Sequence, residues 1–419
     1  MDDLSRIKFS NFISLIAPVK VLLIIFCIFC ILADISAKTH QRRVESIPFE
    51  MVGTYVVIKV KINDSSPLNL ILDSGIRNTI ITELQPGDRI SLNYSDVTDL
   101  MGLGGGNHLE AYSSNYNTLK IGKLKIQPKT VYVLKEDIFN LSKHTGIKIN
   151  GLIGVDFFQD YIIEIDYSKK KVSFYDNKSF IDPKGFEKIP ITLESQKMFI
   201  KLSVLENDST QKEVKMLIDT GAELNAWFQS YKKESVQIQG LGIRATIGQG
   251  LNGEIKGKIG RVRQICFGSF CLQNPIVSFP DSSSIAEIVG KSDRDGTIGS
   301  QILSRFNVFI DYSQKQFYFK PNGNFNNKFY YNIAGIEIVQ IFPFVPNTEV
   351  WRVWENSPAA LAGIKNGDQI VEVNGQKAFQ FNINEIRRIF ETPSKFPLSL
   401  TILRDSKEVS VKIEMKSKI

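Results

Sequence analysis

The chain has 419 residues, of which 43% are apolar, so it is long enough for more than one domain and apolar enough to bury a sizeable core. Its formal net charge is +7, but lysine and arginine are spread along the sequence. A nucleic-acid-binding protein would gather them on one face or in one run, so we expect no nucleic-acid partner.

The first segment is typical of an export signal. Basic residues precede an uninterrupted apolar run from Val21 to Leu32, which has the length of a signal-peptide core and is shorter than the ~20 residues of a membrane span. Ile35-Ser36-Ala37 offers a cleavage site. Because residues 12–19 are also apolar and could lengthen the run, an uncleaved anchor stays open, and with it an association with the membrane. We expect residues 1–37 to be a signal peptide or membrane anchor and the rest to be extracytoplasmic: periplasmic, secreted or membrane-anchored.

The sequence that follows is duplicated. Each half has short strands rich in β-branched residues, an Asp-Ser/Thr-Gly element, a glycine-rich stretch, a hairpin and a segment that ends in Ile-Gly. Asp219 follows Asp73 by 146 residues (219 − 73), and Gly248 follows Gly102 by the same number. A constant spacing between several features predicts two copies of one β-rich unit, over 45–180 and 187–322.

Each copy brings one acid to the end of an apolar strand. Asp73-Ser74-Gly75 follows Leu70–Leu72, and Asp219-Thr220-Gly221 follows Met216–Ile218. If a pseudo-twofold axis relates the copies, the two carboxyl groups meet on it and share a proton. One acid then acts as general base on a water, and the other as general acid on a carbonyl. The plainer alternative is that each Asp caps a turn.

The two cysteines of the body lie close together. Cys266 and Cys271 enclose four residues, 267–270, that predict a hairpin with a Gly-Ser turn and place the two thiols opposite each other. An oxidising compartment would join them in a disulfide. The alternative is two buried free thiols.

As a set, these features over residues 47–320 resemble the aspartic peptidases of the pepsin and retropepsin clan. The resemblance implies a mostly β fold, in which two retropepsin-like β-barrel halves form a pepsin-like bilobal domain. It implies that Asp73 and Asp219 are catalytic, and that the active-site loops contain Ser74, Gly75, Thr220 and Gly221. It also implies flaps over the cleft at Gly104, Gly105, Gly250 and Leu251.

One residue departs from the family pattern. The position after Asp-Thr/Ser-Gly is usually small, as Ala222 is, but the first half has Ile76. A bulky side chain there would crowd the first carboxyl group. If it desolvated that group, it would raise the pKa of Asp73.

The last unit, residues 329–416, is separate. It resembles a PDZ domain of the bacterial type through Asn356-Ser357-Pro358-Ala359-Ala360 and the Gly363–Asp368 segment. The resemblance implies a bacterial protein whose loop at Gly335 and Ile336 receives the C-terminus of a peptide by strand addition. The alternative is a unit that only packs on the rest of the chain.

Two other patterns lead to no site. Gly248–Gly253 is a literal G-x-G-x-x-G, but a strand-like sequence follows it, whereas a dinucleotide site needs a helix. The three histidines have no metal spacing. We expect an aspartic endopeptidase that needs no cofactor and no metal and acts on a peptide or protein substrate. The alternative is a catalytically silent peptide-binding protein of retropepsin fold.

Overall fold

The computed structural model describes residues 41–100, 109–229, 235–250, 253–289, 293–342 and 345–419. The predicted signal or anchor segment therefore lies outside the described residues. Within the ranges just given, no helix combines the length and the apolar character that crossing a membrane requires.

The first copy is an eight-stranded sheet in the order β2-β3-β4-β9-β5-β8-β7-β6, and an additional pairing between β3 and β7 curls it toward a barrel. Its elements are β2 (Glu50–Val52), β3 (Tyr55–Ile62), β4 (Leu68–Leu72), β5 (Thr79–Ile81), β6 (Tyr94–Leu100), β7 (Leu109–Ile121), β8 (Leu124–Leu134), β9 (Gly151–Ile153) and the short helix α2 (Leu141–Thr145). Short β-branched runs broken by glycine and asparagine favour such a sheet.

The second copy repeats this plan in a ten-stranded sheet, in the order β17-β18-β21-β16-β22-β15-β14-β19-β20 with β13 paired to β14. Its strands are β13 (Thr192–Glu194), β14 (Lys197–Leu205), β15 (Gln211–Ile218), β16 (Ala226–Phe228), β17 (Gln239–Gly250), β18 (Gly253–Arg261), β19 (Gln264–Phe267), β20 (Phe270–Gln273), β21 (Ile276–Pro280) and β22 (Gly296–Ile298). Its helices are α3 (Ser282–Val289) and α4 (Ser300–Leu303).

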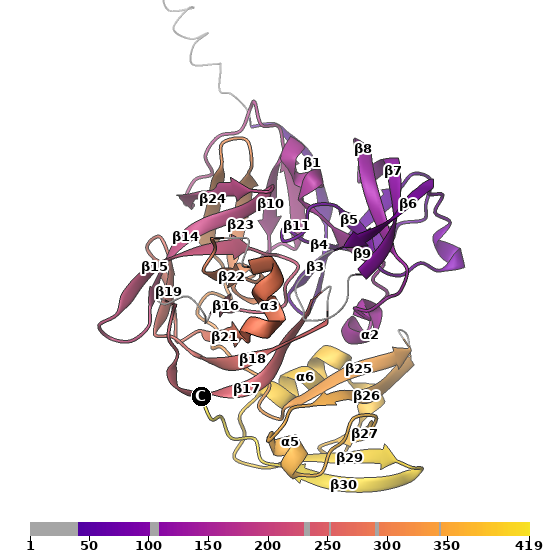
Figure 1. Cartoon of the computed structure of the whole chain (residues 1–419), viewed down its shortest axis with the longest axis vertical. Helices are drawn as coiled ribbons and strands as arrows, with labels where there is room; N and C mark the ends of the chain where they lie inside the picture. The colour runs from indigo at the N-terminus through magenta and orange to yellow at the C-terminus, as the bar shows by residue number, and fades with distance from the viewer. Residues whose placement is uncertain (1–40, 101–108, 230–234, 251–252, 290–292, 343–344) are drawn as a thin grey trace, which may run out of the picture. The chain divides into compact units, whose positions relative to one another are not determined.

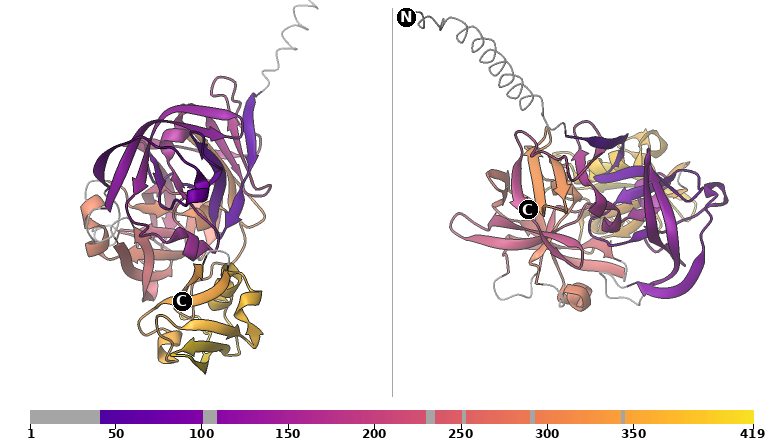
Figure 2. Two further views of the ribbon diagram at one scale, coloured as in Figure 1. Left: turned by 90° about the vertical axis from the view of Figure 1, so that its right-hand side faces the viewer. Right: turned by 90° about the horizontal axis from the view of Figure 1, so that it is seen from above.

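A third sheet joins the copies (Figure 1 and Figure 2). Its order is β1-β11-β10-β23-β24-β12, so each copy supplies three neighbouring strands. The strands are β1 (Arg43–Pro48), β10 (Ile162–Asp166), β11 (Lys171–Tyr175), β12 (Glu187–Pro190), β23 (Phe306–Asp311) and β24 (Gln316–Pro321). The copies meet where β10 pairs antiparallel with β23, and Glu164 lies opposite Phe309.

The C-terminal unit has a sheet of its own, in the order β25-β26-β27-β29-β30, with β28 paired to β27. Its elements are β25 (Ile336–Phe342), β26 (Val345–Val353), α5 (Pro358–Leu361), β27 (Gln369–Val373), β28 (Gln376–Lys377), α6 (Ile383–Glu391), β29 (Leu398–Arg404) and β30 (Lys407–Ile413). Asn382 and Glu385 form a capping box that starts α6. The chain is thus mostly β throughout, as the sequence predicts.

Candidate active site

The two acids of the repeated element lie at equivalent points of the two sheets, each directly after a strand. Asp73 follows β4, which runs parallel to β9, and its amide donates to the Ile153 carbonyl at 3.0 Å. Asp219 follows β15, which runs parallel to β22, and its amide donates to the Ile298 carbonyl at the same distance. The Ile-Gly segments that the sequence repeats are therefore the strands that fix the backbone of each acid.

The hydroxyl groups next to the acids tie the copies together. The Ser74 amide donates to Thr220 Oγ1, and the Thr220 amide donates to Ser74 Oγ, both at 3.0 Å. Ser74 Oγ donates to the Ile218 carbonyl (2.7 Å), and Thr220 Oγ1 donates to the Leu72 carbonyl (2.6 Å). Each hydroxyl thus both accepts from and donates to the strand end of the opposite copy, and the pattern is symmetric. These four bonds set the spacing of the two loops.

The glycines of the two loops allow each loop to approach the opposite acid. The Gly75 amide donates to Asp73 Oδ1 (2.7 Å), and the Gly221 amide donates to Asp219 Oδ1 (3.1 Å). A Cβ at Gly75 would lie 2.4 Å from Asp219 Oδ2, and one at Gly221 would lie 2.1 Å from Asp73 Cγ. Any side chain would therefore push the carboxyl groups out of place.

The two carboxyl groups are hydrogen-bonded to each other and have unequal proton affinities. Burial raises the pKa of Asp73 well above its usual range, and the nearby charge of Asp219 raises it further. Burial also raises the pKa of Asp219, but the positive charges of Lys197 and Arg294 oppose that shift. We infer that the pair shares one proton, which resides mainly on Asp73 and leaves Asp219 as the carboxylate.

The sequence patterns did not point to Lys197 or Arg294. Lys197 is half-buried at the start of β14, and Arg294 is 5% exposed just before β22. Lys197 begins strand β14, which pairs with β15 so that Phe199 lies opposite Leu217. Arg294 carries no local signal, because its placement depends on strands that are distant in sequence.

Ile76 packs into the first copy. It is half-buried and contacts two apolar clusters, one around Ile71 and Leu152 and the other around Ile80 and Leu134. An isoleucine at this position therefore has an ordinary packing role.

The predicted flap residues lie at or beyond the ends of two hairpins. Gly250 is the last residue of β17 and pairs with Gly253, the first of β18. Gly104 and Gly105, between β6 and β7, and Leu251 lie outside the described residues. The described part of the G-x-G-x-x-G sequence ends β17 and begins β18, whereas a dinucleotide site would need it to open a helix.

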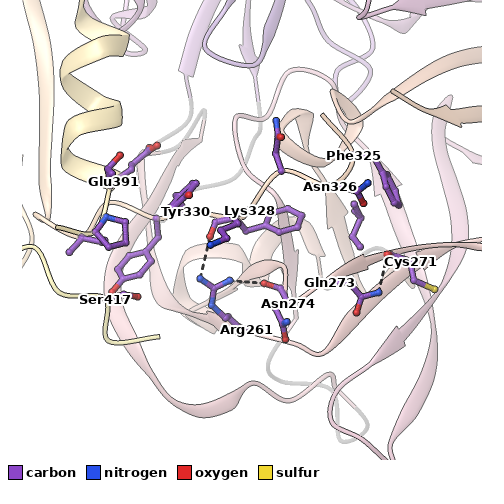
Figure 3. Close-up of a pocket in the computed structure, with 17 residues that line it drawn as sticks. Arg261, Cys271, Gln273, Asn274, Phe325, Asn326, Lys328, Tyr330, Glu391 and Ser417 are labelled. Carbon is purple, nitrogen blue, oxygen red and sulfur yellow. Dashed lines mark hydrogen bonds between the residues drawn. The ribbon is translucent and has the colours of Figure 1, made fainter. Parts of the chain in front are cut away.

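Cys266 and Cys271 form the predicted disulfide, across the hairpin of β19 and β20. Cys271 also lines a cavity of about 680 Å³ (Figure 3). There the Arg261 guanidinium donates to the carbonyls of Asn274 (2.6 Å) and Phe329 (3.2 Å). Neither Asp73 nor Asp219 lines this cavity, so it is separate from the pair of acids.

The predicted peptide-binding loop of the C-terminal unit lies just before the edge strand β25. Gly335 has a φ of 71°, and Ile336 is the first residue of β25. The amides of both donate to Asn332 Oδ1, at 2.9 and 3.3 Å. A peptide carboxylate that used these two amides would have to displace the Asn332 side chain.

Comparison with known proteins identifies the two parts of the chain. No curated protein sequence matches it. Among solved structures, the aspartic proteinase from Irpex lacteus is similar to this chain at 16% identity and a TM-score of 0.42, over 68% of this chain and 98% of that one. A family model described as "Aspartyl protease" matches residues 58–157 and 201–302, and one described as "PDZ domain" matches residues 349–404. The chain therefore contains an aspartyl protease domain, matched once in each copy of the repeat, followed by a PDZ domain.

Proposed function

We propose that this protein is an aspartic endopeptidase that hydrolyses peptide bonds with a water held between Asp73 and Asp219. The observation that carries the proposal is the symmetric set of bonds between Ser74 and Thr220, which holds two buried carboxyl groups in contact. Burying two acids together is unfavourable, since burial raises the pKa of both and the charge of Asp219 raises that of Asp73 further. Such a pair is typical of acid–base catalysis.

The unequal proton affinities assign a role to each acid. The Asp219 carboxylate takes a proton from the water as the water oxygen attacks the scissile carbonyl carbon. Asp73 gives its proton to the carbonyl oxygen, so that a neutral tetrahedral diol forms. When the diol collapses, the C–N bond breaks, the nitrogen receives the proton from Asp219, and Asp73 takes a hydroxyl proton back. The chain forms no covalent bond to the substrate.

The test is to remove each acid separately. Asp73→Asn and Asp219→Asn should each lower kcat/KM on a peptide library by several orders of magnitude, with folding intact by circular dichroism. Asp182→Asn is the matched control, because Asp182 is an exposed carboxylate paired with Lys188. If wild type binds peptides but cleaves none, the protein is the silent peptide-binding alternative. If either Asn variant keeps most of the activity, the shared site is wrong.

We further propose that the PDZ domain binds the C-terminus of a substrate or partner peptide along β25. Support comes from the family match. Fluorescence anisotropy with peptides that end in a free or an amidated carboxyl group tests this. Equal affinity for both forms would contradict recognition of a C-terminus.

We also propose that the protein works outside the cytoplasm, in the periplasm, at the membrane or secreted. The apolar run from Val21 to Leu32 and the disulfide of Cys266 and Cys271 support this. Cell fractionation, together with the mass of the mature N-terminus, would distinguish a cleaved signal from an anchor. Recovery of the full-length chain in the soluble cytoplasmic fraction would contradict the proposal.

A further inference from the structure

The helix α2 of the first copy lies against the PDZ domain. Residues Arg43–Ile419 form one compact unit, so the contacts between these two parts lie within it. Helix α2 packs on both β25 and α6, which also pack on each other. Gly146, which caps the end of α2, marks the place: a Cβ there would lie 2.5 Å from Gln340 Oε1 of β25 and 3.1 Å from Ile383 Cγ2 of α6. The end of α2 therefore lies between this strand and this helix.

Arg387 of α6 holds the three elements together. Its guanidinium donates to the His144 carbonyl of α2 at 2.6 Å and to the Ile338 carbonyl of β25 at 3.4 Å. The last carbonyls of a helix have no partner within it, and an arginine commonly satisfies them. The PDZ domain thus binds the backbone of α2 through a charged donor, as it would bind a ligand.

The side chain of His144 is enclosed in the same contact. Its ring meets that of Trp351 edge to face, with 5.8 Å between the centroids. Burial, together with the positive charges of Arg387 and Arg352, lowers the pKa of His144 to about 4. The contact therefore keeps water away from the imidazole and favours its neutral form. A further positive charge at this position would be unfavourable.

A second contact ties the PDZ domain to the β17–β18 hairpin of the other copy. Arg352 of β26 pairs with Glu254, the second residue of β18, and with Glu337 at 2.5 Å. Trp354 Nε1 donates to the other oxygen of Glu337 at 2.7 Å and so holds that carboxylate in place. Glu254 lies next to the pair of Gly250 and the first residue of β18, where the predicted flap begins. The PDZ domain thus contacts the first copy and the predicted flap of the second.

A peptide that added to β25 would meet α2. Strand addition uses free backbone groups of the receiving strand, and Arg387 already occupies the Ile338 carbonyl. Among the described residues β25 pairs with β26 alone, and the end of α2 lies beside β25 together with α6. The docking face that α2 covers consists of Ile338, Gln340, Ile383 and Arg387.

We propose that the end of α2 is an internal ligand of this docking face, and that a peptide C-terminus binds the PDZ domain by displacing it. Displacement also separates Arg352 from Glu254 and releases the β17–β18 hairpin. Glu254 is 40% exposed, so this ion pair contributes little free energy and a bound peptide can replace it. The inference rests on the proposed binding of a peptide C-terminus by the PDZ domain, and it identifies what that binding displaces.

The experiment compares peptide binding in variants that weaken the contact. The parent and every variant carry Asp219→Asn, so that the probes are not consumed. The probe is a library of fluorescent decapeptides with four random final residues and a free C-terminus, and the amidated library is its control. His144→Lys adds a cation beside Arg387 and Arg352, so it should undock α2 without altering the PDZ domain. Tyr116→Lys is the matched control, because Tyr116 is 85% exposed in the same copy and receives the same charge.

The undocked variant should bind peptides more tightly than the parent. A protein binds with reduced apparent affinity when its competent state is a minor population. With an undocked population of about 10% or less, His144→Lys should lower the apparent Kd at least about tenfold, and Tyr116→Lys should leave it unchanged. Trp351→Ala removes the ring contact from the other side and should act in the same direction. In the parent, saturating peptide should raise hydrogen–deuterium exchange at residues 141–147 and 253–256.

The outcomes separate this inference from the proposal on which it rests. Equal affinities in the parent, His144→Lys and Trp351→Ala overturn the internal ligand and leave peptide recognition standing. So does bound peptide that leaves exchange at residues 141–147 unchanged. Binding by the two undocked variants alone supports the inference, and Trp351→Ala decides it if circular dichroism shows that His144→Lys does not fold. If no variant prefers the free C-terminus, peptide recognition fails and the inference fails with it.

Discussion

The hydroxyl of Thr220 should make a large contribution to the stability of the protease domain. It accepts from the Ser74 amide and donates to the Leu72 carbonyl, and Thr220 is only 2% exposed. Thr220→Val keeps the shape but leaves a buried donor and a buried acceptor without this partner. Each such group costs about 1–3 kcal/mol, so for the two groups we expect a loss of roughly 2–6 kcal/mol in the free energy of unfolding. The melting temperature, followed by near-UV circular dichroism, should then fall by at least about 4 °C.

Thr79→Val is the matched control for this change. Thr79 is fully buried in β5, and its hydroxyl has no hydrogen-bond partner among the described residues. Replacing it by valine removes an unsatisfied polar atom, so the melting temperature should stay constant or rise. If Thr220→Val and Thr79→Val had equal effects, the bonds between the two loops would contribute nothing measurable. Ser74→Ala combined with Thr220→Val should be less harmful than the sum of the two, because both hydroxyls belong to one network.

Three further results are expected. Burial raises the pKa of Asp73 above its value in the unfolded chain, so the stability that this group contributes is complete at low pH and is lost as pH rises through the raised pKa. Asp73→Asn should therefore raise the melting temperature at pH 7 but not at pH 3. An equal change at both pH values would contradict the assignment. Gly75→Ala should abolish proteolysis, since its Cβ would lie 2.4 Å from Asp219 Oδ2, and retention of most of the wild-type kcat/KM would show that the loop can shift. Reducing the bond between Cys266 and Cys271 should lower stability by an amount near the low end of ~2–4 kcal/mol, because the closed loop is short; a calorimetric scan with and without reductant measures it, and superimposable scans would refute the expectation.

The features that the sequence predicts well are those that both copies share. Asp73 and Asp219 could be paired because a constant spacing marks them as equivalent, and equivalence implies an axis on which they meet. The disulfide could be predicted because a two-residue turn fixes which residues of a hairpin lie opposite each other.

The features that the sequence leaves hidden are those in which the copies differ. Arg294 corresponds to the apolar Ile149 at the repeat spacing of 145 residues (294 − 149), so a search for repeated patterns passes over it. Asn332 was missed for another reason. Its side chain reaches the amides of the PDZ loop only because the backbone turns at Gly335, and nothing in the spacing of these residues indicates such a bond.

The pairing of β10 with β23 reveals how the two copies are related in space. Glu164 lies opposite Phe309, and Phe309 is also the residue that corresponds to Glu164 in the repeat. Their spacing of 145 residues (309 − 164) is the same as that of Asp166 and Asp311. The axis therefore passes through this pair, as it would in a dimer of two identical chains. An identical dimer must present the same residue on both sides of its axis. A fused chain is free of that constraint, so the second copy can carry the cationic Arg294 where the first has the apolar Ile149. The surroundings of the two acids thereby differ, and a peptide bound across the pair would be distinguished from the same peptide reversed.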